Sequence, residues 1–188
     1  MATIVNQTRV GAPAKASGGI YTAPLGTALP TDASTALTEA FKLGGLITQD
    51  GLNEAPSRST ENIKSWGGHT ARVLQSEYAL KLTYTIMERT EESLKEVFGP
   101  DNVTAASAVG GTTRSIMKKA DQLPTMVRVA DMLDSGVKIR SVYPLSQVVE
   151  VGETQYHGAG LISYQLTVEC YPDKDGVYGY EYEFVPSS

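Results

Sequence analysis

The chain has 188 residues, of which 41% are hydrophobic and 20% charged, and its formal net charge is -5. These fractions are those of an ordinary globular protein with one core, so they argue against global disorder and fibrous repeats. The sequence carries no basic run, which disfavours tight binding to nucleic acid. No apolar segment approaches the roughly 20 residues that span a bilayer, so we expect no membrane partner.

Residues 1–40 are predicted to form an extended N-terminal arm, because Gly and Pro interrupt every periodic pattern there. The stretch 18–33, GGIYTAPLGTALPTDA, is apolar enough to require burial but too broken for a helix or a long strand. Its apolar side chains are therefore expected to bury against a neighbouring subunit, the candidates being Ile20, Tyr21, Leu25 and Leu29. The alternative is a frayed chain end. Residues 33–43 are predicted to form one short helix or a turn.

Residues 41–188 are predicted to form a single mainly β domain. Apolar and polar residues alternate in several segments, as they do in half-buried antiparallel strands, namely 77–87, 137–151, 161–171 and 178–184. Short polar residues and a glycine at 134–136 and 173–176 predict tight hairpin turns. The fold class expected is an antiparallel β-sandwich.

One short flanking helix is predicted over residues 90–98. Thr90 can cap its N-terminus, Glu91 and Glu92 suit the positive first turn, and Gly99-Pro100 ends it. Its apolar face is expected to cover an open side of the sheet.

A long polar loop or a protruding hairpin is predicted over residues 48–70, which include the single tryptophan of the chain, Trp66. Loops of this length in a compact domain are usually functional, so Trp66 is a candidate contact with another subunit. The alternative is a hairpin that lies on the body with Trp66 in the core.

Catalytic and cofactor motifs are absent from the sequence. His69 and His157 are isolated, and Gly110-Gly111 opens no phosphate-binding loop. The segment 173–176 resembles the middle of a calcium loop, but both end-ligand positions hold tyrosine. Cys170 alternates with apolar residues and is predicted to be a small core residue. We therefore expect no enzyme activity, no cofactor and no metal.

The stretch 18–33 and the segment that follows it, LTEAFKLGGLITQDGLNEA, resemble the start of major tail tube proteins from long-tailed, siphovirus-type bacteriophages of actinobacterial hosts. The resemblance is strongest over the first 70 residues or so and then rests on the order of elements. It implies a tail-tube β-sandwich whose subunits form stacked hexameric rings. The rings build the tube through which the genome is ejected, with arms and a long loop bridging successive rings.

The resemblance also implies the partners of the chain and its location. The partners would be other copies, the tail tip or baseplate, the tape measure protein and the tail terminator, in a virion assembled in the host cytoplasm. Viral DNA would pass through without specific binding, so acidic side chains are expected on the channel face. The candidates are Glu77, Glu169, Glu181 and Glu183. The alternative is a minor virion β-sandwich protein, such as a tube terminator, a decoration protein or a carbohydrate-binding module.

Overall fold

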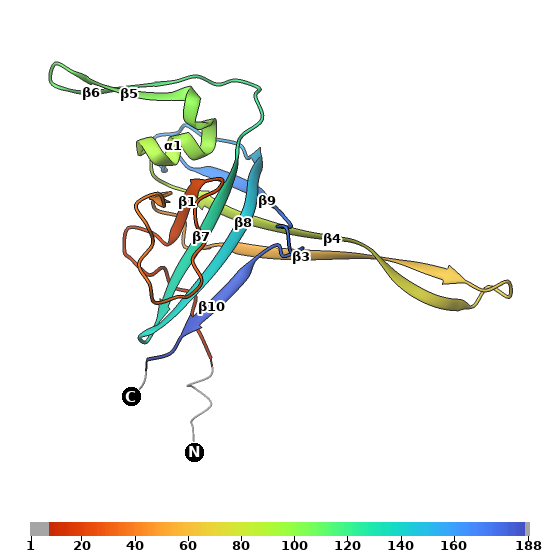
Figure 1. Cartoon of the computed structure of the whole chain (residues 1–188). Coiled ribbons are helices and arrows are strands. Elements are labelled where there is room, and N and C mark those ends of the chain that lie inside the picture. Colours follow the sequence, from red (N-terminus) through yellow and green to blue (C-terminus); the bar gives the residue numbers. More distant parts are fainter. Residues whose placement is uncertain (1–7, 187–188) are drawn as a thin grey trace.

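The structure is a computed structural model that describes residues 8–186, and it is mainly antiparallel β with one short α-helix (Figure 1). This agrees with the predicted fold class. The strands are β1 (Ile20–Pro24), β2 (Lys42–Leu43), β3 (Asn53–Lys64), β4 (Thr70–Ile86), β5 (Val103–Ala108), β6 (Gly111–Ile116), β7 (Thr125–Asp134), β8 (Val137–Val151), β9 (Tyr164–Tyr171) and β10 (Tyr180–Phe184). The helices are α1 (Glu91–Phe98) and a 3-10 turn, Pro100–Asn102.

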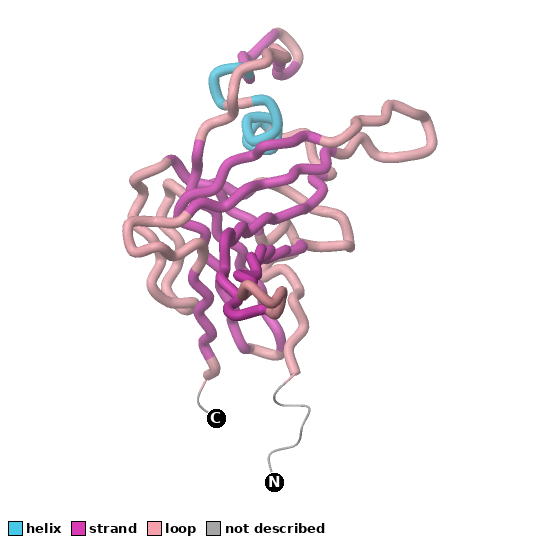
Figure 2. The backbone as a smooth tube through the Cα atoms, turned by 90° about the vertical axis from the view of Figure 1, so that its right-hand side faces the viewer, coloured by secondary structure: helices cyan, strands magenta, loops and turns pink. Residues whose placement is uncertain are grey.

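The main sheet runs in the order β2-β1-β7-β8-β9-β4-β3, and β10 joins it at β8. One edge of β8 pairs with β7, whereas the other is shared by two strands. Lys138–Val142 pair with β10, and Leu145–Val151 pair with β9. Because β9 and β10 occupy successive parts of one edge of β8, the sheet divides there. Figure 2 shows the strands forming the body of the molecule, with the helical segment above them. The result is consistent with a β-sandwich.

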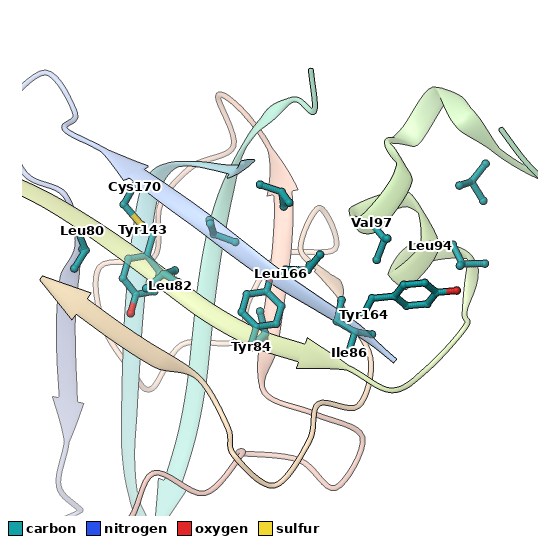
Figure 3. Packing of buried hydrophobic residues seen from close by; sticks show 14 residues of the cluster. Leu80, Leu82, Tyr84, Ile86, Leu94, Val97, Tyr143, Tyr164, Leu166 and Cys170 are labelled. Carbon is teal, nitrogen blue, oxygen red and sulfur yellow. The ribbon is translucent and has the colours of Figure 1, made fainter. Parts of the chain in front are cut away.

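The larger core cluster lies between β4, β8, β9 and α1. Apolar residues of β4 stand directly opposite apolar residues of β9, so that Leu80 faces Cys170 and Leu82 faces Val168 across the ladder. In Figure 3, Leu80, Leu82 and Cys170 lie at one end of this cluster, and Leu94 and Val97 of α1 lie at the other end. The period-two pattern read from the sequence is therefore confirmed, and it sets which face of the sheet is buried.

Helix α1 begins and ends as its sequence predicts. The Thr90 hydroxyl accepts a hydrogen bond from the Ser93 amide at 3.1 Å, which satisfies one of the free N–H groups of the first turn. Gly99 has φ +94° and donates its N–H to the Lys95 carbonyl. The inner face packs on the sheet, and Phe98 meets the Tyr164 ring edge-on at 5.7 Å between centroids.

Part of the stretch 18–33 belongs to the main sheet of its own chain. β1 pairs with β7 along all five of its residues, and Ile20 and Tyr21 are buried in the core of their own chain, at 4% and 8% exposure. The glycine before them has a packing role, because a Cβ on Gly19 would lie 2.6 Å from the Asp131 carbonyl oxygen. Residues 33–41 contain turns and no helix.

The segment 48–70 contains the strand β3 and the turn into β4. It therefore forms a protruding hairpin, which was one of the two forms predicted for it. Its twelve β3 residues are all exposed. Trp66 lies outside the core, with its side chain fully exposed. The alternative of a hairpin lying on the body is therefore wrong.

Candidate assembly surfaces

The longest projection of the molecule is the outer part of the β3–β4 hairpin, residues 57–77, which we call the outer hairpin (Figure 1). β4 is exposed from Thr70 to Glu77 and becomes buried only further along, where it meets β9. In the described part of the chain, β3 pairs with β4 alone. A two-stranded ribbon with neither face covered is marginally stable in water, so the outer hairpin is suited to contact another chain.

The turn at the end of the outer hairpin is held by backbone hydrogen bonds. The Ser65 amide donates to the His69 carbonyl at 2.8 Å, and the Gly68 amide donates to the Ser65 carbonyl at 2.9 Å. Gly68 has φ +82°, a backbone conformation that favours glycine. These bonds give the tip a defined shape and present Trp66 outward.

Apolar side chains are exposed on both strands and on the tip of the outer hairpin. Trp66 has 104% exposure, and the others are Ile63, Val73 and Leu74. Scattered exposed apolar residues are common on protein surfaces, but here four lie on one unpaired projection. Their burial would require a partner, which is why we treat the outer hairpin as the main candidate interface.

A second projection is the β5–β6 hairpin, which forms a separate two-stranded sheet beside α1. Val103 at its base is buried, whereas Val109 at its tip is fully exposed. Gly110 has φ +84° and lies in the turn between the two strands. Residues 111–116 form β6.

A buried network of charged and hydroxyl groups connects α1 to the sheet. Arg128 of β7 donates from Nε to Glu96 Oε1 at 3.2 Å and from Nη1 to Ser146 Oγ at 2.8 Å. The Tyr84 hydroxyl donates to the same glutamate oxygen. Burial is the main cause of a strongly raised pKa at the Tyr84 phenol, which keeps it a hydrogen-bond donor. Sequence reasoning missed this network, although an arginine between two valines in a strand was a visible signal.

A cavity of about 670 Å³ lies between α1, β1, β2 and the start of β7, and we call it the helix cavity. The buried Arg128 and Glu96 form part of its wall. Apolar residues supply much of the rest, namely Pro24, Ala40, Leu123, Pro124, Met126 and Val148. Its volume lies within the range of roughly 300–1,000 Å³ typical of binding pockets.

The predicted contact residues lie in different settings. Leu25 is exposed at 57% and Leu29 packs partly on the smaller core cluster, whereas Ile20 and Tyr21 are internal. Trp66 is therefore the large apolar candidate that remains fully available. The roles of Leu25, Leu29 and Trp66 between subunits stay predictions.

The predicted acidic channel residues are not all brought together. Glu181 and Glu183 are exposed and lie on one face of β10, while Glu169 is half-exposed on β9 and Glu77 lies on the outer hairpin. Glu183 is engaged by Arg9, whose Nε lies 2.6 Å from the carboxylate. The channel role of these four residues stays a prediction.

Side chains that could ligate a metal ion are not gathered into a site within the described residues 8–186. No group of three or more His, Cys, Asp or Glu in this range could hold a metal ion. Asp173 instead shapes the predicted hairpin turn, because its carboxylate accepts the Asp175 and Val177 amides and the Tyr180 hydroxyl. Cys170 is buried, and burial is the main cause that raises the pKa of its thiol to about 12. No helix among the described residues has the length and apolar character needed to cross a membrane.

A mainly β body with two projecting, unpartnered hairpins is typical of a structural subunit that assembles with other chains. The chain matches the family described as phage tail tube protein over residues 5–181, and it belongs to that family. It is thus a structural component of a phage tail. Among solved structures it is similar to the tube-terminating cap of the anti-feeding prophage, with 8% identity, a TM-score of 0.48, and coverage of 96% of this chain and 98% of that chain. No curated protein matches it.

Proposed function

We propose that the chain is the major tail tube subunit of a long-tailed, siphovirus-type phage of an actinobacterial host. It polymerises as stacked hexameric rings around the channel through which the genome is ejected. The observation that carries this proposal is the outer hairpin, a long ribbon with exposed apolar side chains and no partner in its own chain among the described residues. Family membership supplies the class of assembly.

The outer hairpin favours repeated stacking because it extends well beyond the body that would form a ring (Figure 1). Each copy would reach a copy in the adjacent ring and bury Trp66 and its apolar neighbours there. A continuous row of such contacts makes a tube grow, and pairing also protects the exposed β3 edge from uncontrolled association. A tube terminator, one of the alternative minor virion proteins, would stop after one ring.

The proposed channel carries DNA without binding it specifically. The chain has a net charge of -5, and fixed positive charge on the channel face would hold the phosphate backbone. Glu181 and Glu183 are proposed to face the channel, together with Glu77 and Glu169. The proposed partners are other copies, the tail tip or baseplate, the tape measure protein and the tail terminator, with assembly in the host cytoplasm. The role is structural, with no enzyme activity.

Negative-stain electron microscopy of the full chain over a concentration series tests the proposal, and hollow tubes are expected. The matched variant replaces residues 59–77 with Asn-Gly, which joins the register partners Arg58 and Tyr78 through a two-residue turn. Because the buried end of β4 is untouched, this variant should fold but form no stacked tubes. Single rings from the unmodified chain would favour the terminator, and normal tubes from the shortened chain would remove the role assigned to the hairpin.

A further inference from the structure

We propose that a pocket at the base of the outer hairpin binds the Arg72 side chain of a second copy of this chain. The pocket has a volume of about 170 Å³ and lies between β8, β10 and the inner part of the β3–β4 hairpin, and we call it the tyrosine pocket. The inference rests on the proposed function, because it names the surface that the outer hairpin of one ring contacts on the next.

The tyrosine pocket lies where the main sheet divides. Tyr143 follows the part of β8 that pairs with β10 and precedes the part that pairs with β9. Gly179, just before β10, allows the chain to pass close to Tyr143, because a Cβ at this glycine would lie 3.1 Å from a ring carbon. In Figure 1, β10 and the β3–β4 hairpin run in different directions from this region.

The lining of the tyrosine pocket is aromatic and acidic. The aromatic residues are Tyr78, Tyr143, Tyr178 and Tyr180. Its charged residues are Glu54 and Glu181, and none of the described residues that line it is Lys, Arg or His. Neither carboxylate forms a salt bridge within residues 8–186. The lining therefore carries two uncompensated negative charges, which select a cationic occupant.

The size and the chemistry of the tyrosine pocket suit one arginine side chain. Its volume is below the roughly 300–1,000 Å³ of small-molecule pockets. The Tyr143 hydroxyl donates to Glu54 Oε2 at 2.6 Å, which orients the carboxylate that would receive the guanidinium. A guanidinium also attracts tyrosine ring faces. Arg58 already lies 4.8 Å from the Tyr78 ring centroid, but it donates to Gln75 and lies outside the lining.

The distal part of the outer hairpin, residues 62–74, carries the complementary charge. It holds Lys64 and Arg72, both exposed, and its sequence contains no Asp or Glu. Arg72 is the better match, because its planar guanidinium can contact a carboxylate and a ring together, whereas an ammonium is a compact point charge. From Glu54 to Ile63, the register partner of Arg72, β3 extends about 30 Å. Arg72 can therefore reach the tyrosine pocket only in another copy.

A contact between the end of one hairpin and the base of the next is heterologous, so it can repeat from ring to ring without closing on a pair of chains. This is the kind of contact that lengthens a tube. The contact uses Glu181 in place of its proposed channel role, whereas Glu77, Glu169 and Glu183 keep theirs.

Exchange of the two charges tests the contact by negative-stain electron microscopy of the full chain. Arg72→Glu and Glu181→Arg should each raise the protein concentration needed for tubes by about tenfold or more, because each brings like charges together. The double variant should form tubes at the concentration that the unmodified chain needs. Both positions are exposed, so all three variants should stay folded by circular dichroism. Tube formation is the readout, and it does not depend on whether DNA passes Glu181.

Two further double variants are the matched controls for this exchange. Lys64→Glu with Glu181→Arg changes the other basic residue of the distal hairpin, and Arg72→Glu with Glu153→Arg changes an exposed acidic residue outside the tyrosine pocket. Neither combination should restore tubes. Restoration by either one would show a general effect of charge and would contradict the specific contact.

Disulfide trapping gives a second and independent measurement. One copy carries Leu74→Cys, two residues from Arg72 on the same strand, and the other carries Glu181→Cys. Oxidation of mixed tubes should give a covalent dimer, whereas Leu74→Cys mixed with Glu153→Cys should give none. Lack of restoration by the charge exchange, together with no trapped dimer, would overturn this inference and leave the tube function intact. Failure of the unmodified chain to form any tube would overturn the proposed function, and this inference with it.

Discussion

Nη2 of Arg128 lies 3.2 Å from Oε1 of Glu96, and both side chains are almost completely buried, at 2% and 4% exposure. This ion pair connects β7 to α1, two elements that no sequence pattern places side by side. The same glutamate oxygen accepts the Tyr84 hydroxyl from β4. The helix is therefore held over the sheet at one defined position, and the helix cavity lies beside that anchor.

Removing one member of the buried pair should destabilise the fold strongly. Arg128→Met leaves the buried Glu96 carboxylate without its cation, and losses for such pairs are about 3–5 kcal/mol. Urea denaturation followed by circular dichroism measures the free energy of unfolding. The double variant Arg128→Met with Glu96→Leu should recover much of the loss. Lys138→Met, at an exposed position, serves as the control, and an equal loss there would contradict the assignment.

The helix cap at Thr90 should contribute a smaller amount. Thr90→Ala removes the acceptor of the Ser93 amide, and the usual cost of losing such a cap is about 1 kcal/mol. Thr90→Ser keeps a hydroxyl in the same place and should stay close to the unmodified chain. Midpoints of thermal or urea unfolding compare the three proteins, and equal midpoints would mean that the cap adds nothing.

Asp32 should make the stability of the chain depend on pH in the acidic range. Its carboxylate accepts the Thr35 and Ser34 amides and hydroxyls, with the Thr35 bonds the largest cause, and these bonds hold its pKa well below the ordinary 3.8. A depressed folded pKa gives stability that is fully present above pH 3.8 and is lost as the pH falls toward the folded pKa.

The variant Asp32→Ala tests this dependence. The stability difference between it and the unmodified chain should be constant near neutral pH and should shrink as the pH is lowered below 3.8. Urea midpoints in a series of acidic buffers give the comparison. A difference that stays constant down to strong acid would show that the carboxylate does not act through its charge.

Cys170 should be unreactive in the folded protein. Its thiol is buried, and with a pKa raised to about 12 it holds almost no thiolate at pH 8. Ellman's reagent should therefore label it only after urea unfolding. Ala40→Cys supplies an exposed thiol as the control and should react at once in the native state. Fast reaction of Cys170 in the unmodified protein would mean that β9 opens readily.

The strands and the helix were predicted from local sequence patterns, namely the alternation of apolar residues and the capping residues. The alternation around Leu82 and Val168 predicted half-buried strands, and these residues stand opposite each other in the core. Thr90 and Gly99 marked the ends of the helix because capping and termination depend on neighbouring residues alone. The N-terminal segment resembles tail tube proteins, and the match over residues 5–181 shows that the chain belongs to the tail tube family.

The errors concern contacts between distant parts of the chain. From its sequence neighbours alone, Gly19 suggests an irregular segment. In the structure, the lack of a side chain at Gly19 allows the chain to pass close to the backbone of Asp131, more than a hundred residues away in sequence. The predicted arm contacts Ile20 and Tyr21 were for this reason assigned to another subunit instead of to the core. The β5–β6 strands were also missed, because small polar residues carry little strand signal.

The sequence by itself determined the class of fold, the helix and the hairpin turns, since periodicity, caps and turn residues act over a few neighbouring positions. Only the tertiary structure decided that β1 completes the sheet, that Arg128 meets Glu96, and that Trp66 lies at the end of an unsupported ribbon. Each of these depends on which distant segments pack together. Burial and the absence of a partner are properties of that packing, so they have no local signature in the chain.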